Sequence, residues 1–125
     1  RIQVYFPGLA SAVELIKSGK LRALGVTTAD RSKVLPDVPA VAEVVPGYEA
    51  STWYGIVAPK GTPAEIVDKL NMEINAGLAD ANVLARIASL GGVPMVSTPS
   101  GFAKFIAEET AKWAEVVKKA GIKAN

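Results

Sequence analysis

The stretch from Leu35 to Pro63 constrains the fold of this chain more than any other feature. Prolines recur along it at Pro36, Pro39, Pro46, Pro59 and Pro63. Proline fixes φ and has no amide hydrogen to give to a sheet, so the first part of the stretch is predicted to be rigid loop. The apolar run from Trp53 to Ala58 contains no proline and is predicted to be a buried strand.

A helix is predicted to follow this strand. Thr62 and Glu65 have the spacing of a capping box, and Pro63 stands where the first helical residue would be. Asp80 is predicted to cap the next helix, which ends at Gly91-Gly92. The last helix is predicted to run from Thr98-Pro99 to Gly121.

The first part of the chain is predicted to form a strand, a helix and a second strand. The strands cover Ile2 to Phe6 and Leu21 to Val26, and the helix opens after Pro7-Gly8 and closes at Gly19. Such units join parallel strands by a right-handed crossover, which indicates an α/β fold. A long connection from Thr27 to Ser51 follows, with one turn of helix expected at Ala40 to Val44.

The residue inventory argues against catalysis and against a metal site. Histidine and cysteine are absent, so the commonest general base and the strongest nucleophile are unavailable. Glu108 and Glu109 are adjacent on a predicted helix and face different directions. No cluster of metal ligands stands out. We therefore expect no catalytic residue, no metal and no cofactor.

Charge and hydropathy exclude two further classes. The net charge is +2 with scattered basic residues, and aromatic residues make up 6% of the chain, so nucleic-acid binding is not expected. The sequence has no uninterrupted apolar run of about 20 residues, so insertion into a membrane is not expected either.

The candidate binding site is the turn Phe6, Pro7, Gly8, Leu9, Ala10 and Ser11. Here a predicted strand ends and a helix begins, and the unpaired amides of the first helical turn can hold a carboxylate without a basic side chain. The alternative is an ordinary strand-to-helix turn. A second series of hydroxyls near the ends of the other predicted strands has the same two interpretations; it consists of Thr27, Thr28, Ser32, Ser51 and Thr52.

Several motifs occur together in a recognisable order. They are Gly19-Lys20-Leu21-Arg22-Ala23-Leu24-Gly25-Val26-Thr27, Leu35-Pro36-Asp37-Val38-Pro39 with Val41-Ala42-Glu43, Pro46-Gly47-Tyr48-Glu49, the run from Trp53 to Pro63, and Lys112-Trp113 in the last helix. In this order and spacing the chain resembles the Bug family, the periplasmic solute receptors of tripartite tricarboxylate transporters. Bug receptors are much longer, so the resemblance is to the C-terminal part of one.

The resemblance implies a two-lobed α/β fold like that of type II periplasmic binding proteins. Residues 1–51 would supply second-lobe elements and the long loop, and residues 52–125 the strand that crosses between lobes and the C-terminal helices. It also implies a periplasmic receptor without catalysis, which captures a small carboxylate and delivers it to the transporter membrane subunits.

Within such a receptor, the turn from Phe6 to Ser11 would line the pocket between the lobes. Many family members carry Asp where this chain has Pro7, so specificity for amino acids does not carry over to it. A simple carboxylate ligand remains the expectation.

The sequence leaves two alternatives to the receptor function, and the resemblance has one consequence for the chain by itself. The first alternative is a small enzyme that uses carboxylates or hydroxyls alone, for which substitution of Glu43 or Glu49 should abolish turnover. The second is a regulatory or assembly module that keeps the receptor fold and binds protein. The consequence concerns the later helices, whose apolar stripes would lose a partner without the first lobe. The chain by itself is therefore expected to associate as a dimer.

Overall fold

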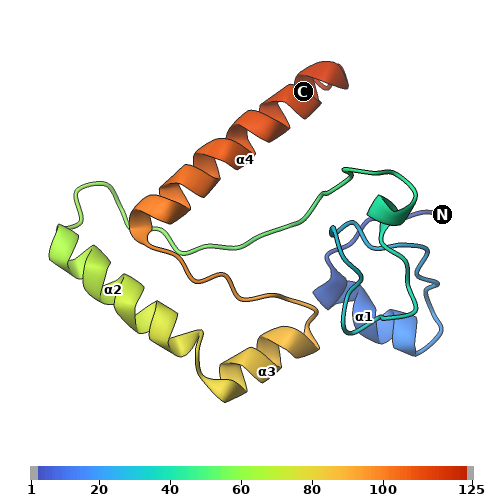
Figure 1. The fold of residues 1–125 in the computed structure, drawn as a ribbon, viewed down its shortest axis with the longest axis horizontal. Coiled ribbons are helices and arrows are strands. Elements are labelled where there is room, and N and C mark those ends of the chain that lie inside the picture. Colours follow the sequence, from blue (N-terminus) through green and yellow to red (C-terminus); the bar gives the residue numbers. More distant parts are fainter. Residues whose placement is uncertain (1–2, 124–125) are drawn as a thin grey trace. The chain divides into compact units, whose positions relative to one another are not determined.

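The computed structural model describes residues 3–123, whose regular elements are helical (Figure 1). In chain order these are α1 (Leu9–Lys17), the 3-10 turn η1 (Val41–Glu43), α2 (Ala64–Gly77), α3 (Ala81–Ser89) and α4 (Pro99–Lys119). The described residues form two compact units. Unit 1 contains residues 3–57 and 79–94, and unit 2 contains residues 58–78 and 95–123.

Most predicted helix ends are confirmed, because they depend on local chemistry. Gly19, with φ of +74°, follows the last turn of α1. Asp80 Oδ1 accepts hydrogen bonds from the amides of Asn82 and Val83 at 2.9 and 3.1 Å, which caps α3. Thr98 Oγ1 accepts from the Gly101 amide at 3.0 Å and caps α4 in the same way.

The predicted start of α2 is wrong. The Thr62 hydroxyl donates to the carbonyl of Pro59 at 2.8 Å and closes the preceding turn instead of capping the helix. Pro63 is the N-cap residue, no side chain caps the helix, and α2 begins at Ala64. Glu65 is therefore one position too early in the helix to complete a capping box with Thr62.

The predicted strands do not form within residues 3–123. Residues 3–6, 21–25 and 52–58 belong to no strand, and Ile2 lies outside the described residues. The pairing found in this part of the chain is an isolated parallel bridge between Val26 and Ala40. The Val26 amide donates to the Pro39 carbonyl, and the Val41 amide donates to the Val26 carbonyl, both at 2.9 Å. A strand requires a neighbour with which to exchange backbone hydrogen bonds, and the described residues supply none for these segments.

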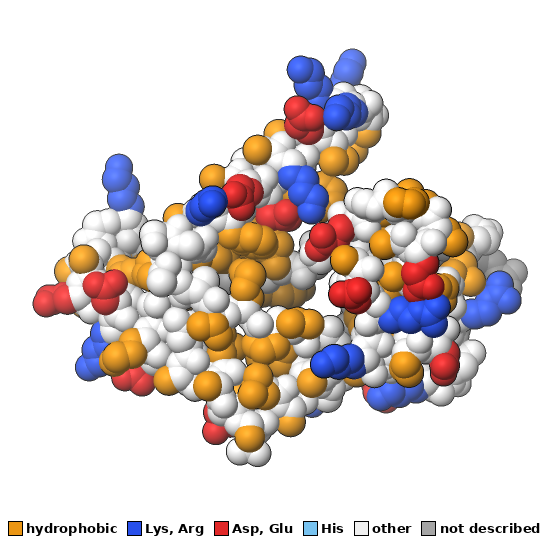
Figure 2. Space-filling view, in the orientation of Figure 1, with side chains coloured by type: hydrophobic (Ala, Val, Ile, Leu, Met, Phe, Trp, Pro, Cys, Tyr) orange, Lys and Arg blue, Asp and Glu red, His pale blue; other side chains and the backbone are white. Residues whose placement is uncertain are grey.

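Each unit has its own packing. Ala12 and Val13 of α1, together with Ala40 beside η1, are the buried residues of unit 1. In unit 2, α2 packs against α4, and the side chains of Asn71 and Asn75 both donate to the Ser97 carbonyl, at 2.9 and 3.0 Å. Hydrophobic side chains also lie open on the viewed surface (Figure 2). No helix among residues 3–123 combines the length and the apolar character needed to cross a bilayer.

Candidate functional site

The turn from Phe6 to Ser11 leads directly into α1. Gly8 is the N-cap residue, with φ of −62° and ψ of 138°, and no side chain caps the helix. The Gly8 carbonyl accepts from the Ser11 amide at 3.0 Å and from the Ser11 hydroxyl at 2.8 Å. These contacts stabilise the turn and pair the Ser11 amide. The amides of Leu9 and Ala10, at the start of α1, have no acceptor within the helix.

The electrostatics of this turn favour an anion. The first turn of α1 carries no acidic side chain, and its last turn carries Lys17. The positive end of the helix dipole is therefore not neutralised by a side chain of the first turn. Phe6 is 81% exposed and Gly8 is also exposed, so a ligand can reach these amides from solvent. The sequence prediction that residues 6–11 bind a ligand remains a prediction on this geometry.

The long loop after Val26 is held by an ion pair that the sequence did not reveal. Arg31 donates to the two carboxylate oxygens of Glu43, from Nε at 2.7 Å and from Nη2 at 2.8 Å. Its Nη1 also donates to the Pro36 carbonyl at 3.2 Å, and Glu43 accepts from the Ala40 amide at 2.9 Å. The hydrogen bonds from Arg31 and Ala40 lower the pKa of Glu43 to about 2 and, in return, the carboxylate raises the pKa of Arg31.

This ion pair gives Glu43, one of the two carboxylates considered for catalysis, a structural role. Its two oxygens are engaged by the guanidinium and by a backbone amide, so it is poorly suited to accept a proton from a substrate. Spacing alone could not have identified the pair, because its members are twelve positions apart along a largely irregular loop. The signal in the sequence was the pair of prolines between them, Pro36 and Pro39, which indicates a rigid loop.

Three residues of the hydroxyl series take part in turn structure. The Thr28 hydroxyl donates to the Asp30 carbonyl at 2.7 Å, and the Ser32 hydroxyl accepts from the Val34 amide at 3.4 Å. The Thr27 carbonyl accepts from the Ala50 amide at 2.9 Å, which draws the two ends of the loop together. For the hydroxyls of Thr28 and Ser32 the structure supports the interpretation as turn chemistry, whereas Thr27 takes part through its backbone.

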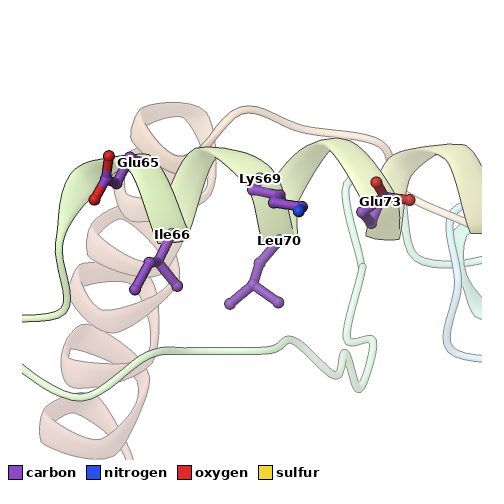
Figure 3. Close-up of a pocket in the computed structure, with 5 residues that line it drawn as sticks. All are labelled: Glu65, Ile66, Lys69, Leu70 and Glu73. Carbon is purple, nitrogen blue, oxygen red and sulfur yellow. The ribbon is translucent and has the colours of Figure 1, made fainter.

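A surface hollow of about 380 Å³ lies on α2 rather than at the predicted site. It is lined by Glu65, Ile66, Lys69, Leu70 and Glu73, with the apolar pair Ile66 and Leu70 pointing to the same side of the helix (Figure 3). Two carboxylates and one ammonium give the hollow a net negative charge, which disfavours an organic acid. The hollow is therefore an exposed apolar face of α2 and a poor site for such a ligand.

Comparison with known proteins places the chain in a family. The family model described as "Tripartite tricarboxylate transporter family receptor" matches residues 2–122. The chain is 40% identical to Protein BugT of Bordetella pertussis over 116 residues, which covers 92% of this chain and 36% of BugT. It is 36% identical over 127 residues to a UPF0065 protein from the tcbD-tcbE intergenic region of Pseudomonas sp. strain P51, with 100% of this chain and 38% of that protein covered.

A solved structure agrees with these sequence relatives. The periplasmic binding protein BugD superposes with a TM-score of 0.84 and 37% identity, over 91% of this chain and 39% of BugD. The chain thus spans little more than a third of the length of these relatives. The predicted fold class, part of a periplasmic binding protein, is confirmed by this match, although the predicted strands have no ladders within residues 3–123. The chain belongs to the receptor family of tripartite tricarboxylate transporters.

Proposed function

We propose that this chain is part of a periplasmic receptor that captures a small organic acid and delivers it to the membrane subunits of a tripartite transporter. The family match over residues 2–122 carries the receptor role. Capture and delivery require binding and release but no chemical step, so no catalytic residue is assigned.

The proposed ligand class rests on the start of α1. An uncapped helix N-terminus with no acidic residue in its first turn offers backbone amides and a positive dipole end to a carboxylate. Pro7 brings no carboxylate to the turn, so a ligand ammonium would find no partner there. We therefore favour di- and tricarboxylates over amino acids.

Thermal unfolding of the natural protein carrying this sequence tests the ligand class. A panel of citrate, succinate and glutamate would be compared with a neutral amide analogue of citrate. A ligand that binds only the native state stabilises it by about 2.7 kcal/mol at a concentration one hundred times its Kd. We expect a rise in Tm with citrate or succinate and none with the amide. If no acid of the panel raises Tm, the proposed ligand class is wrong.

A pair of matched variants tests the location. Ala10→Asp places a carboxylate in the first turn of α1, and Asn82→Asp places one at the same position of α3, a helix of equal length. In both variants the new carboxylate should interact favourably with the dipole of its own helix, so neither change should destabilise the helix. We expect only Ala10→Asp to weaken acid binding, by about tenfold or more, because its charge would repel the ligand at close range. Equal affinities for the two variants would contradict this location.

A further inference from the structure

The chain leaves α3 through a glycine, Gly91, in a backbone conformation that other residues rarely adopt. Gly91 has φ of +75°, and its amide donates to the Ala88 carbonyl at 2.9 Å. The Gly92 amide then donates to the Ile87 carbonyl at 3.0 Å. These bonds end α3 and turn the chain, as left-handed glycines commonly do after a helix.

Gly91 differs from the other left-handed glycines in what lies against it. A Cβ added there would lie 2.9 Å from Leu9 Cγ, closer still to Leu9 Cδ2, and 3.3 Å from Val34 Cγ2. The positions that have a similar φ but open space around the added atom are Gly19, Gly47, Gly61 and Gly121. The Leu9 side chain therefore occupies the space that a side chain at position 91 would need.

This contact joins three segments of unit 1 that are distant in sequence. Leu9 is the first residue of α1, Val34 belongs to the long loop, and Gly91 ends α3. Hydrogen bonds of Arg31 tie the loop around Val34, because Arg31 precedes Val34 and donates to the Pro36 carbonyl and the Glu43 carboxylate, which both follow it. The side chains of Leu9 and Val34 thus both lie close to the side-chain-free backbone of Gly91.

We propose that Gly91 is a positioning residue for the start of α1: by leaving room for Leu9, it fixes where the first helical amides stand. The inference deepens the proposed function and rests on it, since those amides are the proposed carboxylate donors. Gly91 touches no ligand in this proposal and acts only through Leu9.

The test compares Gly91→Ala with Gly47→Ala in the natural protein. Both variants force alanine into the left-handed region, but only the first adds a methyl group against Leu9. Amide hydrogen exchange without ligand reports the local stability of the first turn of α1. We expect exchange at residues 9–12 to accelerate about tenfold in Gly91→Ala and less than about twofold in Gly47→Ala. Equal acceleration in both variants would overturn the inference.

A double-mutant cycle separates a steric effect from a general loss of folding. Leu9→Ala removes the two atoms nearest the new methyl group, Leu9 Cγ and Cδ2, and leaves the 3.3 Å approach to Val34. Adding Gly91→Ala to that background should therefore accelerate exchange at residues 9–12 no more than Gly47→Ala does in the parent. This double variant also serves if Gly91→Ala alone fails to fold. Failure of Leu9→Ala to suppress the effect would contradict the proposed route through Leu9.

Citrate affinity of the same variants links the contact to binding. We expect Gly91→Ala to weaken citrate binding by about tenfold relative to Gly47→Ala. If the parent protein binds no acid, the proposed function fails while the exchange comparison still decides whether Gly91 positions α1. If the parent binds citrate and the two variants match in exchange and affinity, the inference alone is wrong.

Discussion

At the scale of single residues, the ionisation of Glu43 depends on its hydrogen bonds with Arg31 and with the Ala40 amide. Its folded-state pKa of about 2 lies below the ordinary 4.5, so folding favours its charged form. The stability that this shift provides is fully present above the unfolded-state pKa and is lost as pH falls from about 4.5 through about 2. The free energy of unfolding should therefore fall across this window, measured by urea denaturation at a series of pH values. Glu43→Gln should lower stability at pH 7 and flatten this fall.

Glu49→Gln is the matched control, since Glu49 lies in the same loop and is absent from the ion pairs found among residues 3–123. Its pH dependence should follow that of the parent. Side chains of Arg31 and Glu43 are 46% and 42% exposed, so high salt should weaken the effect. A Glu43→Gln variant with the same pH profile as the parent would show that the ion pair does not stabilise the fold.

Residue-scale predictions from sequence succeeded where one side chain and its neighbours decide the outcome. Asp80 caps α3 as predicted, and the predicted start of the last helix at Thr98-Pro99 is confirmed, with Thr98 as its cap; each side chain accepts from an amide two or three residues ahead. Thr62 failed since its hydroxyl had a second local acceptor, the Pro59 carbonyl. The Arg31–Glu43 pair was not predictable from local spacing, because it depends on how the loop folds back.

At the scale of elements, the pairing of α2 with the segment before α4 depends on one shared acceptor. Asn71 and Asn75 both donate to the Ser97 carbonyl, which can accept two hydrogen bonds. Either single change to alanine leaves the other amide on the Ser97 carbonyl but also breaks the 3.2 Å hydrogen bond from Asn75 Nδ2 to Asn71 Oδ1, and should cost about 0.5–1.5 kcal/mol. The double variant adds a cost that neither single change has, because it leaves a part-buried carbonyl without a side-chain partner. Urea denaturation with unchanged m-values measures these differences.

Asn82→Ala provides the control for this cycle, because Asn82 is exposed and its side chain bonds to no described residue. It should change stability by less than about 0.5 kcal/mol. Strict additivity of the Asn71 and Asn75 changes would argue that the two amides act independently rather than through Ser97.

At the element scale, the helices predicted from sequence are confirmed, whereas the predicted strands form no ladders within residues 3–123. A helix satisfies its own backbone, so apolar spacing and caps were sufficient for α1, α3 and α4. The residues from Trp53 to Ala58 have strand composition but depend on a neighbouring strand, and residues 3–123 contain none beside them. The local patterns indicated an α/β fold, and the family resemblance added its identification as part of a periplasmic binding protein.

At the scale of the whole molecule, much apolar surface is open. Ala12, Val13 and Ala40 are the buried apolar residues of the described chain, whereas Tyr54, Ile56 and Val57 are 92%, 70% and 75% exposed. Burying one large apolar side chain contributes about 1.5–3 kcal/mol, so an arrangement that covers several of them is strongly favoured. An apolar extended segment with free backbone groups is also a template for pairing with another chain.

The 125-residue polypeptide alone should therefore associate with a second copy through the segment 54–57. Light scattering after size exclusion should show a mass near twice 13.0 kDa, rising with protein concentration. Ile56→Lys should shift the chain toward monomer, because it places a charge in the pairing segment. Val93→Lys, which alters a side chain that is 88% exposed elsewhere in unit 1, should not. A parent polypeptide that stays monomeric at high concentration would contradict self-association, and equal effects of the two lysines would place the contact outside this segment.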